Sequence, residues 1–170
     1  QKNTNQKGLV ISVKKDMRKW LQEMLDAPQK TAMPILSFPA IQLLGISVKD
    51  LISDSDIQAK GMKAVADRVP SAASVSLMDL SVEAECFGSS IVFSDDEVPT
   101  VTGSIVSSLE EAEALKIPEI GSGRTGIYIG AIEKAVKEIT DRPVFAGIIG
   151  PFSLAGRLMD VTEAMIYCYE

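Results

Sequence analysis

The chain has 170 residues, of which 46% are hydrophobic and 24% are charged, a balance typical of one globular domain with a sizeable core. Seventeen Lys and Arg residues against 23 Asp and Glu residues give a net charge of −6, so no broad basic surface is expected, and nucleic acid and membranes are excluded as expected partners. The chain contains no histidine, which excludes a Ser-His-Asp triad, a Cys-His pair and any imidazole metal site within it.

The cysteines and the start of the chain indicate the cellular compartment of the protein. Cys86 and Cys168 form no C-x-x-C pair, so we expect free thiols rather than a zinc or redox motif. No run of 18 apolar residues and no apolar signal core occurs, which predicts a cytoplasmic protein. We expect residues 1–12 to form a frayed tail and residues 13–170 to fold.

The first predicted elements are a helix and a strand. An apolar stripe at helical spacing predicts a helix over residues 12–26, capped by Ser12 and stopped by Pro28. The apolar run MPILSFP at 33–39 is bounded by prolines and is too short for a helix. We therefore expect a buried strand there, the first core strand.

A second helix and strand follow. The pattern predicts a helix over 55–69, opened by Ser55 with Gln58 in capping-box spacing. Residues 72–78 are expected to form a strand, and a short helix over 81–87 closes at Gly88.

The rest of the chain continues the alternation. Residues 89–93 and 101–106 are expected to form a hairpin, and a short helix starting at Ser107 or Ser108 ends before Pro118. A strong helical stripe covers 124–139, the charge-free strand 143–150 should be buried on both faces, and Pro151 opens the last helical region. Alternating strands and helices predict a parallel α/β fold, either a barrel or an open sheet.

Asp79 is the first candidate for chemistry, because it ends a predicted parallel strand, where α/β folds place ligands. The alternative is that it caps the next helix. On a helix, Glu83 would share a face with Asp79 and Glu85 would point away. Two close carboxylates form a candidate acid/base pair.

Three other features favour structural interpretations. The GSGRTG segment at 121–126 does not follow a strand and fails the dinucleotide fingerprint, so a flexible loop is expected. The acidic turn at 94–97 lacks the spacing of a calcium loop and is expected to be solvated. Arg157 follows the last predicted strand. A guanidinium at this position binds a ligand carboxylate or phosphate in the functional interpretation, and the structural interpretation is a surface salt bridge.

The segments MPILSFPA, RVPSAASVSLMDLSVEAECFG and PVFAGIIGPFSLAGRLM together resemble the uroporphyrinogen decarboxylase superfamily, most closely its corrinoid-dependent, methylcobalamin:coenzyme M-type methyltransferase branch. The resemblance implies a (β/α)8 TIM barrel with its site at the carboxyl ends of the strands. With about three core parallel strands and an inserted hairpin, the chain is expected to form the N-terminal half of such a barrel. Its open edges predict self-association.

The resemblance also implies site residues. Asp79 lines up with an aspartate that faces the substrate in the decarboxylases, so Asp79 is the expected catalytic residue and Glu83 the residue that orients it. The expected substrate-binding residues are Phe38, Gly150, Pro151 and Arg157. The decarboxylase's arginine-rich segment, which grips substrate carboxylates, is replaced here by SFPAIQLLGIS, and this replacement favours the methyltransferase branch.

In that branch the resemblance implies zinc, held by a His-x-Cys pair and a later Cys, and methyl transfer between a corrinoid protein and a small thiol. None of those zinc ligands is in this sequence. We therefore expect zinc and corrinoid only in a full-length parent enzyme and no activity from this chain alone. The alternatives are a uroporphyrinogen decarboxylase and a non-catalytic binding or assembly module.

Overall fold

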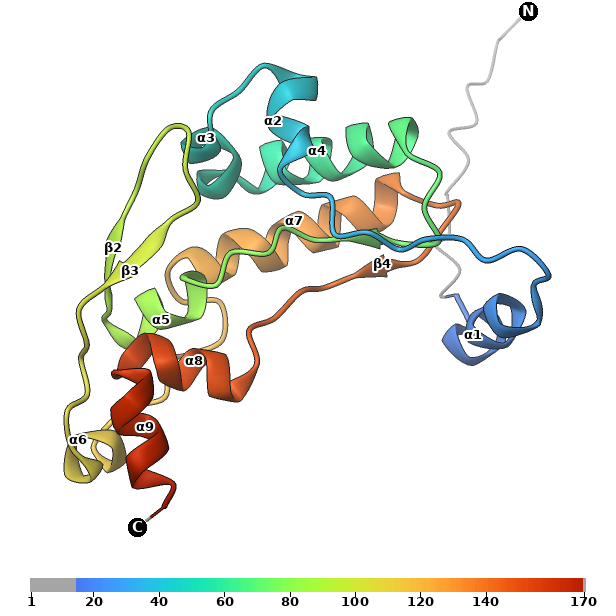
Figure 1. Cartoon of the computed structure of the whole chain (residues 1–170). Helices are drawn as coiled ribbons and strands as arrows, with labels where there is room; N and C mark the ends of the chain where they lie inside the picture. The colour runs from blue at the N-terminus through green and yellow to red at the C-terminus, as the bar shows by residue number, and fades with distance from the viewer. Residues whose placement is uncertain (1–14, 170) are drawn as a thin grey trace, which may run out of the picture.

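The computed structural model describes residues 15–169, so the expected tail at 1–12 lies outside the described residues. The prediction that the first helix starts at Ser12 is wrong, because the helix begins at Met17 and its N-cap is Asp16, which accepts the N–H groups of Arg18 and Lys19. The elements, drawn in Figure 1, are α1 (Met17–Asp26), α2 (Pro39–Leu44), α3 (Val48–Ser53), α4 (Ser55–Arg68), β1 (Ser74–Val75), α5 (Val82–Phe87), β2 (Ser90–Val92), β3 (Thr100–Thr102), α6 (Leu109–Glu113), α7 (Arg124–Glu138), β4 (Val144–Phe145), α8 (Pro151–Leu158) and α9 (Val161–Tyr167).

A short parallel ladder joins two strands that are far apart in the sequence. Ser74 of β1 pairs with Val144 of β4, and Val75 pairs with Phe145. The long helix α7 leads directly into β4 and packs against α4, which precedes β1. This is the parallel α/β arrangement that the alternating pattern predicts, with helices placed between the strands.

The prediction of a strand over residues 33–39 is wrong. This segment runs as extended chain beside β1, held by a hydrogen bond from the Ala72 N–H to the Ala32 carbonyl of 2.9 Å and one from Ser37 Oγ to the Ser76 carbonyl of 2.9 Å. Pro34 has no N–H to donate, and Pro39 starts helix α2. A regular ladder therefore does not form, and the described residues hold two of the three expected core strands.

The strand at the end of α7 is shorter and more exposed than expected. Only Val144 and Phe145 form β4, both half-buried, and Ile148 is 76% exposed. The expectation of a strand over 143–150 buried on both faces is therefore wrong. The physical reason is that a parallel strand is buried on both faces only where other layers cover both faces, and within residues 15–169 β4 pairs with β1 alone and has α7 packed against it.

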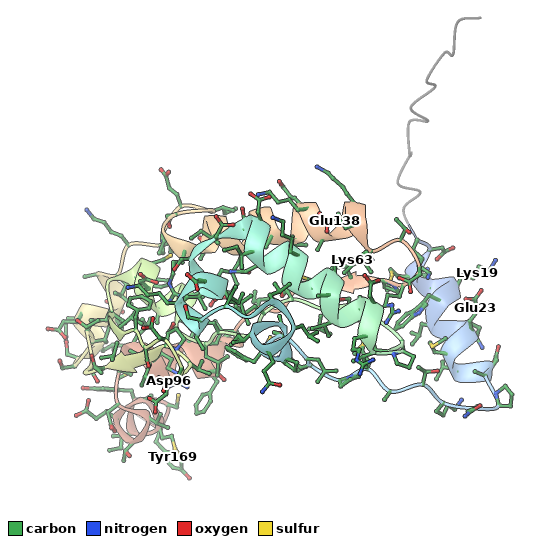
Figure 2. All side chains as sticks on the ribbon, turned by 90° about the horizontal axis from the view of Figure 1, so that it is seen from above. Lys19, Glu23, Lys63, Asp96, Glu138 and Tyr169 are labelled. Atoms are coloured by element: carbon green, nitrogen blue, oxygen red, sulfur yellow. The ribbon has the colours of Figure 1, made fainter. Side chains whose placement is uncertain are left out.

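The hairpin and the amphipathic helices are confirmed. Strands β2 and β3 pair in antiparallel register, with Ile91 opposite Val101. Figures 1 and 2 show α4 and α7 side by side, and the second view labels Lys63 on α4 and Glu138 on α7. Small residues let these helices approach closely, and their shared cluster is Ala59, Met62, Ala66, Ala135 and Ile139. Within residues 15–169 no helix is long and apolar enough to cross a membrane.

The N-terminal cap of α4 is Asp54 rather than the expected Ser55. Its Oδ1 atom accepts the N–H groups of Asp56 at 2.7 Å and Ile57 at 2.9 Å. Ser55 instead accepts a hydrogen bond from Lys134 Nζ at 2.7 Å, and Gln58 is buried. The capping-box expectation fails because aspartate caps a helix at least as well as serine, and Asp54 stands one residue earlier.

We expect Asp54→Ala to lower the melting temperature at pH 7 by about 2–4 °C, because two N–H groups lose their acceptor. Hydrogen bonds from the Ile57 and Asp56 backbones lower the pKa of Asp54, so its contribution is complete above the unfolded pKa, about 3.9, and disappears as the pH falls through the folded pKa. Thermal unfolding followed by circular dichroism at pH 7 and pH 3 should show a smaller deficit at pH 3. Asp54→Asn is the control, since asparagine also caps well; an equal loss from it would contradict the capping role.

Candidate functional site

Asp79 is buried beyond the carboxyl end of β1, with no exposed side-chain surface. Its Oδ1 atom accepts the Ser81 N–H at 2.9 Å and the Ser81 hydroxyl at 2.6 Å. Its Oδ2 atom accepts Arg124 Nη1 at 2.6 Å and the Tyr128 hydroxyl at 3.0 Å. These four donors fill the acceptor positions of the carboxylate. Ser81, rather than Asp79, precedes the first residue of α5 as its N-cap.

Arg124 joins α7 to α5 and to the loop after β1. It is the first residue of α7, its side chain is 10% exposed, and its guanidinium also donates to Ser81 Oγ at 2.8 Å and to a Glu85 carboxylate oxygen. The Phe93 ring lies 5.0 Å from its Cζ atom. Burial pulls the pKa of Arg124 down, but hydrogen bonds and charges from Asp79 and Glu85 outweigh it and raise the pKa. The guanidinium is therefore a permanent cation with its fork committed to protein oxygens.

Tyr128 lies one helical turn after Arg124 and completes the group around Asp79. Burial raises the pKa of its hydroxyl far above the ordinary value, and the negative charge of Asp79 and the hydrogen bond to it raise it further. The hydroxyl therefore stays protonated and serves as a hydrogen-bond donor.

Glu85 does not point away from Asp79 as expected, because Arg124 bridges the two carboxylates. The expectation assumed that Asp79 and Glu85 share one helix, but Asp79 lies in the loop before α5. The spacing argument for a helical face therefore does not apply to Asp79.

The GSGRTG segment at 121–126 forms a tight turn before α7. Gly121 and Gly123 adopt positive φ angles of 83° and 53°, which other residues rarely adopt. A Cβ atom on Gly126 would lie 2.6 Å from the Gly121 carbonyl oxygen. Cys86 Sγ lies 3.1 Å from the Ser122 carbonyl and holds the loop against α5. The segment leads into α7, as expected, and its tight turn sets the position of Arg124.

A cavity of about 280 Å³ opens beside Asp79, between α7 and the segments that follow β1 and β4. Glu83 lines it, and one carboxylate oxygen of Glu83 accepts the Ile149 N–H at 3.3 Å. Most of its other lining side chains are apolar, and neither Lys nor Arg is among them. The structure thus brings Asp79 and Glu83 to one cavity at the carboxyl ends of the parallel strands, where α/β folds place ligands.

The other four predicted site residues lie outside the cavity lining. Phe38 is half-buried and packs on the core cluster of α2 and α3. Gly150 precedes α8 as its N-cap, and Pro151 is the first residue of α8. Arg157, on α8, is half-buried and makes no ion pair within the described part of the chain.

The donor set does not fit the zinc centre that the resemblance implies. Cys86 is half-buried against the Ser122 loop, whereas Cys168 is exposed at the end of α9. Among residues 15–169 no group of three or more His, Cys, Asp or Glu side chains could hold a metal ion. Zinc in structural and catalytic sites needs at least three such protein ligands, so no step through zinc is assigned to these residues.

Two parallel strands joined through helices, with a cavity beside Asp79 and Glu83 at their carboxyl ends, give a candidate site of the α/β type. The family model described as uroporphyrinogen decarboxylase (URO-D) matches residues 27–170. The chain therefore belongs to the uroporphyrinogen decarboxylase family, which confirms the resemblance in its sequence.

The proteins similar to the chain include two methyltransferases. A methylcobamide:CoM methyltransferase from Methanosarcina acetivorans is 39% identical over a region covering 45% of this chain and 23% of the relative. A solved methyltransferase from Methanosarcina mazei shares the fold with a TM-score of 0.67 at 22% identity, covering 81% of this chain and 41% of that structure. The chain thus spans less than half the length of either protein.

Proposed function

We propose that the protein is part of a methyltransferase that moves a methyl group between a corrinoid protein and a thiol acceptor. Its family and its methyltransferase relatives support this coarsely. The observation that carries the choice within the family is the cavity wall, which bears Asp79 and Glu83 but neither Lys nor Arg.

That wall does not suit uroporphyrinogen, which carries many carboxylates. Arginine forks are the natural clamp for carboxylates. The arginine nearest to Asp79, Arg124, already binds Asp79, Glu85 and Ser81. A polycarboxylate in this cavity would meet the Glu83 carboxylate, and the cavity wall offers it no Lys or Arg side chain. Decarboxylation remains the second candidate, because the family description names it.

Within this proposal, the residues described here shape the site rather than hold zinc. Arg124, Ser81 and Tyr128 hold the Asp79 carboxylate in one orientation. Most side chains that line the cavity beside Asp79 and Glu83 are apolar. In the transfer itself the thiol would lose its proton and its sulfur would bond to the methyl carbon, while the electron pair of the broken cobalt–methyl bond would stay on the corrinoid cobalt as Co(I).

The test uses the longest polypeptide that contains this sequence, incubated with methylcobalamin and coenzyme M or, separately, with uroporphyrinogen. We expect the methylcobalamin spectrum to disappear with formation of an equal amount of methylated thiol, and zinc analysis to find bound metal. Coproporphyrinogen without demethylation would contradict the proposal and establish the decarboxylase. Neither product would contradict both and favour a non-catalytic module.

A further inference from the structure

The two carboxylates of the cavity are in different electrostatic states. Asp79 has four donors, one of them a guanidinium. One oxygen of Glu83 accepts a single long hydrogen bond from the Ile149 N–H, and the other accepts none within residues 15–169. No Lys or Arg in that part of the chain lies within ion-pair distance of Glu83. The charge of Asp79 is compensated, and the charge of Glu83 is not.

The surroundings of Glu83 make this imbalance significant. The side chain is half-buried on the first turn of α5 and faces a cavity lined mainly by aliphatic residues, among them Ile129, Ile132 and Ile148. A carboxylate at an apolar wall loses hydration without gaining a counter-charge, which is unfavourable until a cation or a strong donor arrives. Tyr128 also lines the cavity, and an aromatic ring attracts cations through its π face.

We propose that this cavity binds a small organic cation, with the positive group on the Glu83 carboxylate and the apolar body against the isoleucine side chains. A volume of about 280 Å³ accommodates an alkylammonium ion of a few carbon atoms. Anions are disfavoured because the single guanidinium of the group is committed to Asp79, Ser81 and Glu85. The assignment makes Glu83 the ligand-binding carboxylate.

The experiment uses the 170-residue chain and three probes of similar size and different charge: butylammonium, butyramide and butyrate. Binding is followed by two-dimensional 1H–15N NMR. We expect butylammonium to shift the amide signals of Glu83 and Ile149 with a dissociation constant in roughly the millimolar range. Butyramide should bind at least about fivefold more weakly, and butyrate should leave these signals unchanged. Butyrate binding as well as butylammonium would overturn the proposal.

The matched variants are Glu83→Gln and Glu113→Gln. Glutamine keeps an oxygen that accepts the Ile149 N–H, so we expect Glu83→Gln to retain a folded spectrum and to bind butylammonium at least about fivefold more weakly. Glu113 is exposed on α6, so we expect Glu113→Gln to remove the same charge without changing the affinity. Equal affinity in Glu83→Gln and wild type overturns the proposal. The experiment measures ligand binding by this chain and not methyl transfer. A negative binding result would therefore overturn this proposal without deciding the proposed function.

Discussion

Arg124→Met should lower the free energy of unfolding by about 3–5 kcal/mol, the cost of leaving a buried charge without its partner. The Asp79 side chain has no exposed surface, and Arg124 is 10% exposed, so water does not replace the lost guanidinium. Methionine keeps much of the aliphatic stem, which separates loss of charge from loss of packing. Typical domains unfold with only 5–15 kcal/mol, so this single variant removes a large share of the stability.

Denaturant unfolding followed by circular dichroism measures the effect of Arg124→Met. The control is Arg18→Met, because Arg18 is exposed on α1 and forms no ion pair with another described residue. We expect the control to change the free energy of unfolding by less than about 0.5 kcal/mol. Equal effects from the two variants would show that Arg124 is not a buried partner of Asp79.

Gly126→Ala should destabilise the protein by about 1–3 kcal/mol, because the new Cβ would lie 2.6 Å from the backbone carbonyl oxygen of Gly121. That oxygen belongs to a tight turn and cannot rotate away as a flexible side chain would. The turn has to shift, and the start of α7, which carries Arg124, shifts with it.

Gly130→Ala is the matched control for Gly126→Ala on the same helix. Its Cβ would meet Ser55 Cβ at 3.4 Å, an ordinary contact, and alanine favours helix over glycine by about 0.5–1 kcal/mol. We expect a neutral or stabilising effect in the same denaturant unfolding assay. If both variants stabilise the protein, the close approach of Gly126 to Gly121 does not exist in solution.

The parts of the fold that sequence patterns predicted are those with local causes. The stripes of α4 and α7 and the glycine that ends α5 are set within a few residues. The segment at 33–39 has the apolar composition of a strand, but its prolines prevent a ladder. The exposure of the segment at 143–150 depends on which other elements cover its faces, and its own sequence does not encode that.

The candidate site was predicted only in part for a similar reason. Asp79 and Glu83 stand out because they follow a strand and begin a helix. Arg124 and Tyr128 lie 45 and 49 residues beyond Asp79, and only the packing of α7 against α5 brings them to it. The available signal was an arginine among three glycines at 121–126, a pattern that marks a tight turn with a buried side chain as well as a flexible loop.

The candidate site depends most on the buried ion pair between Asp79 and Arg124. A double-mutant cycle with Asp79→Asn, Arg124→Met and the combined variant measures their coupling directly. We predict a coupling of at least about 1 kcal/mol, with the double variant less destabilised than the sum of the single variants, since each single change leaves the other charge buried without its counter-ion. Additive effects, within about 0.5 kcal/mol, would contradict the ion pair and the site built around it.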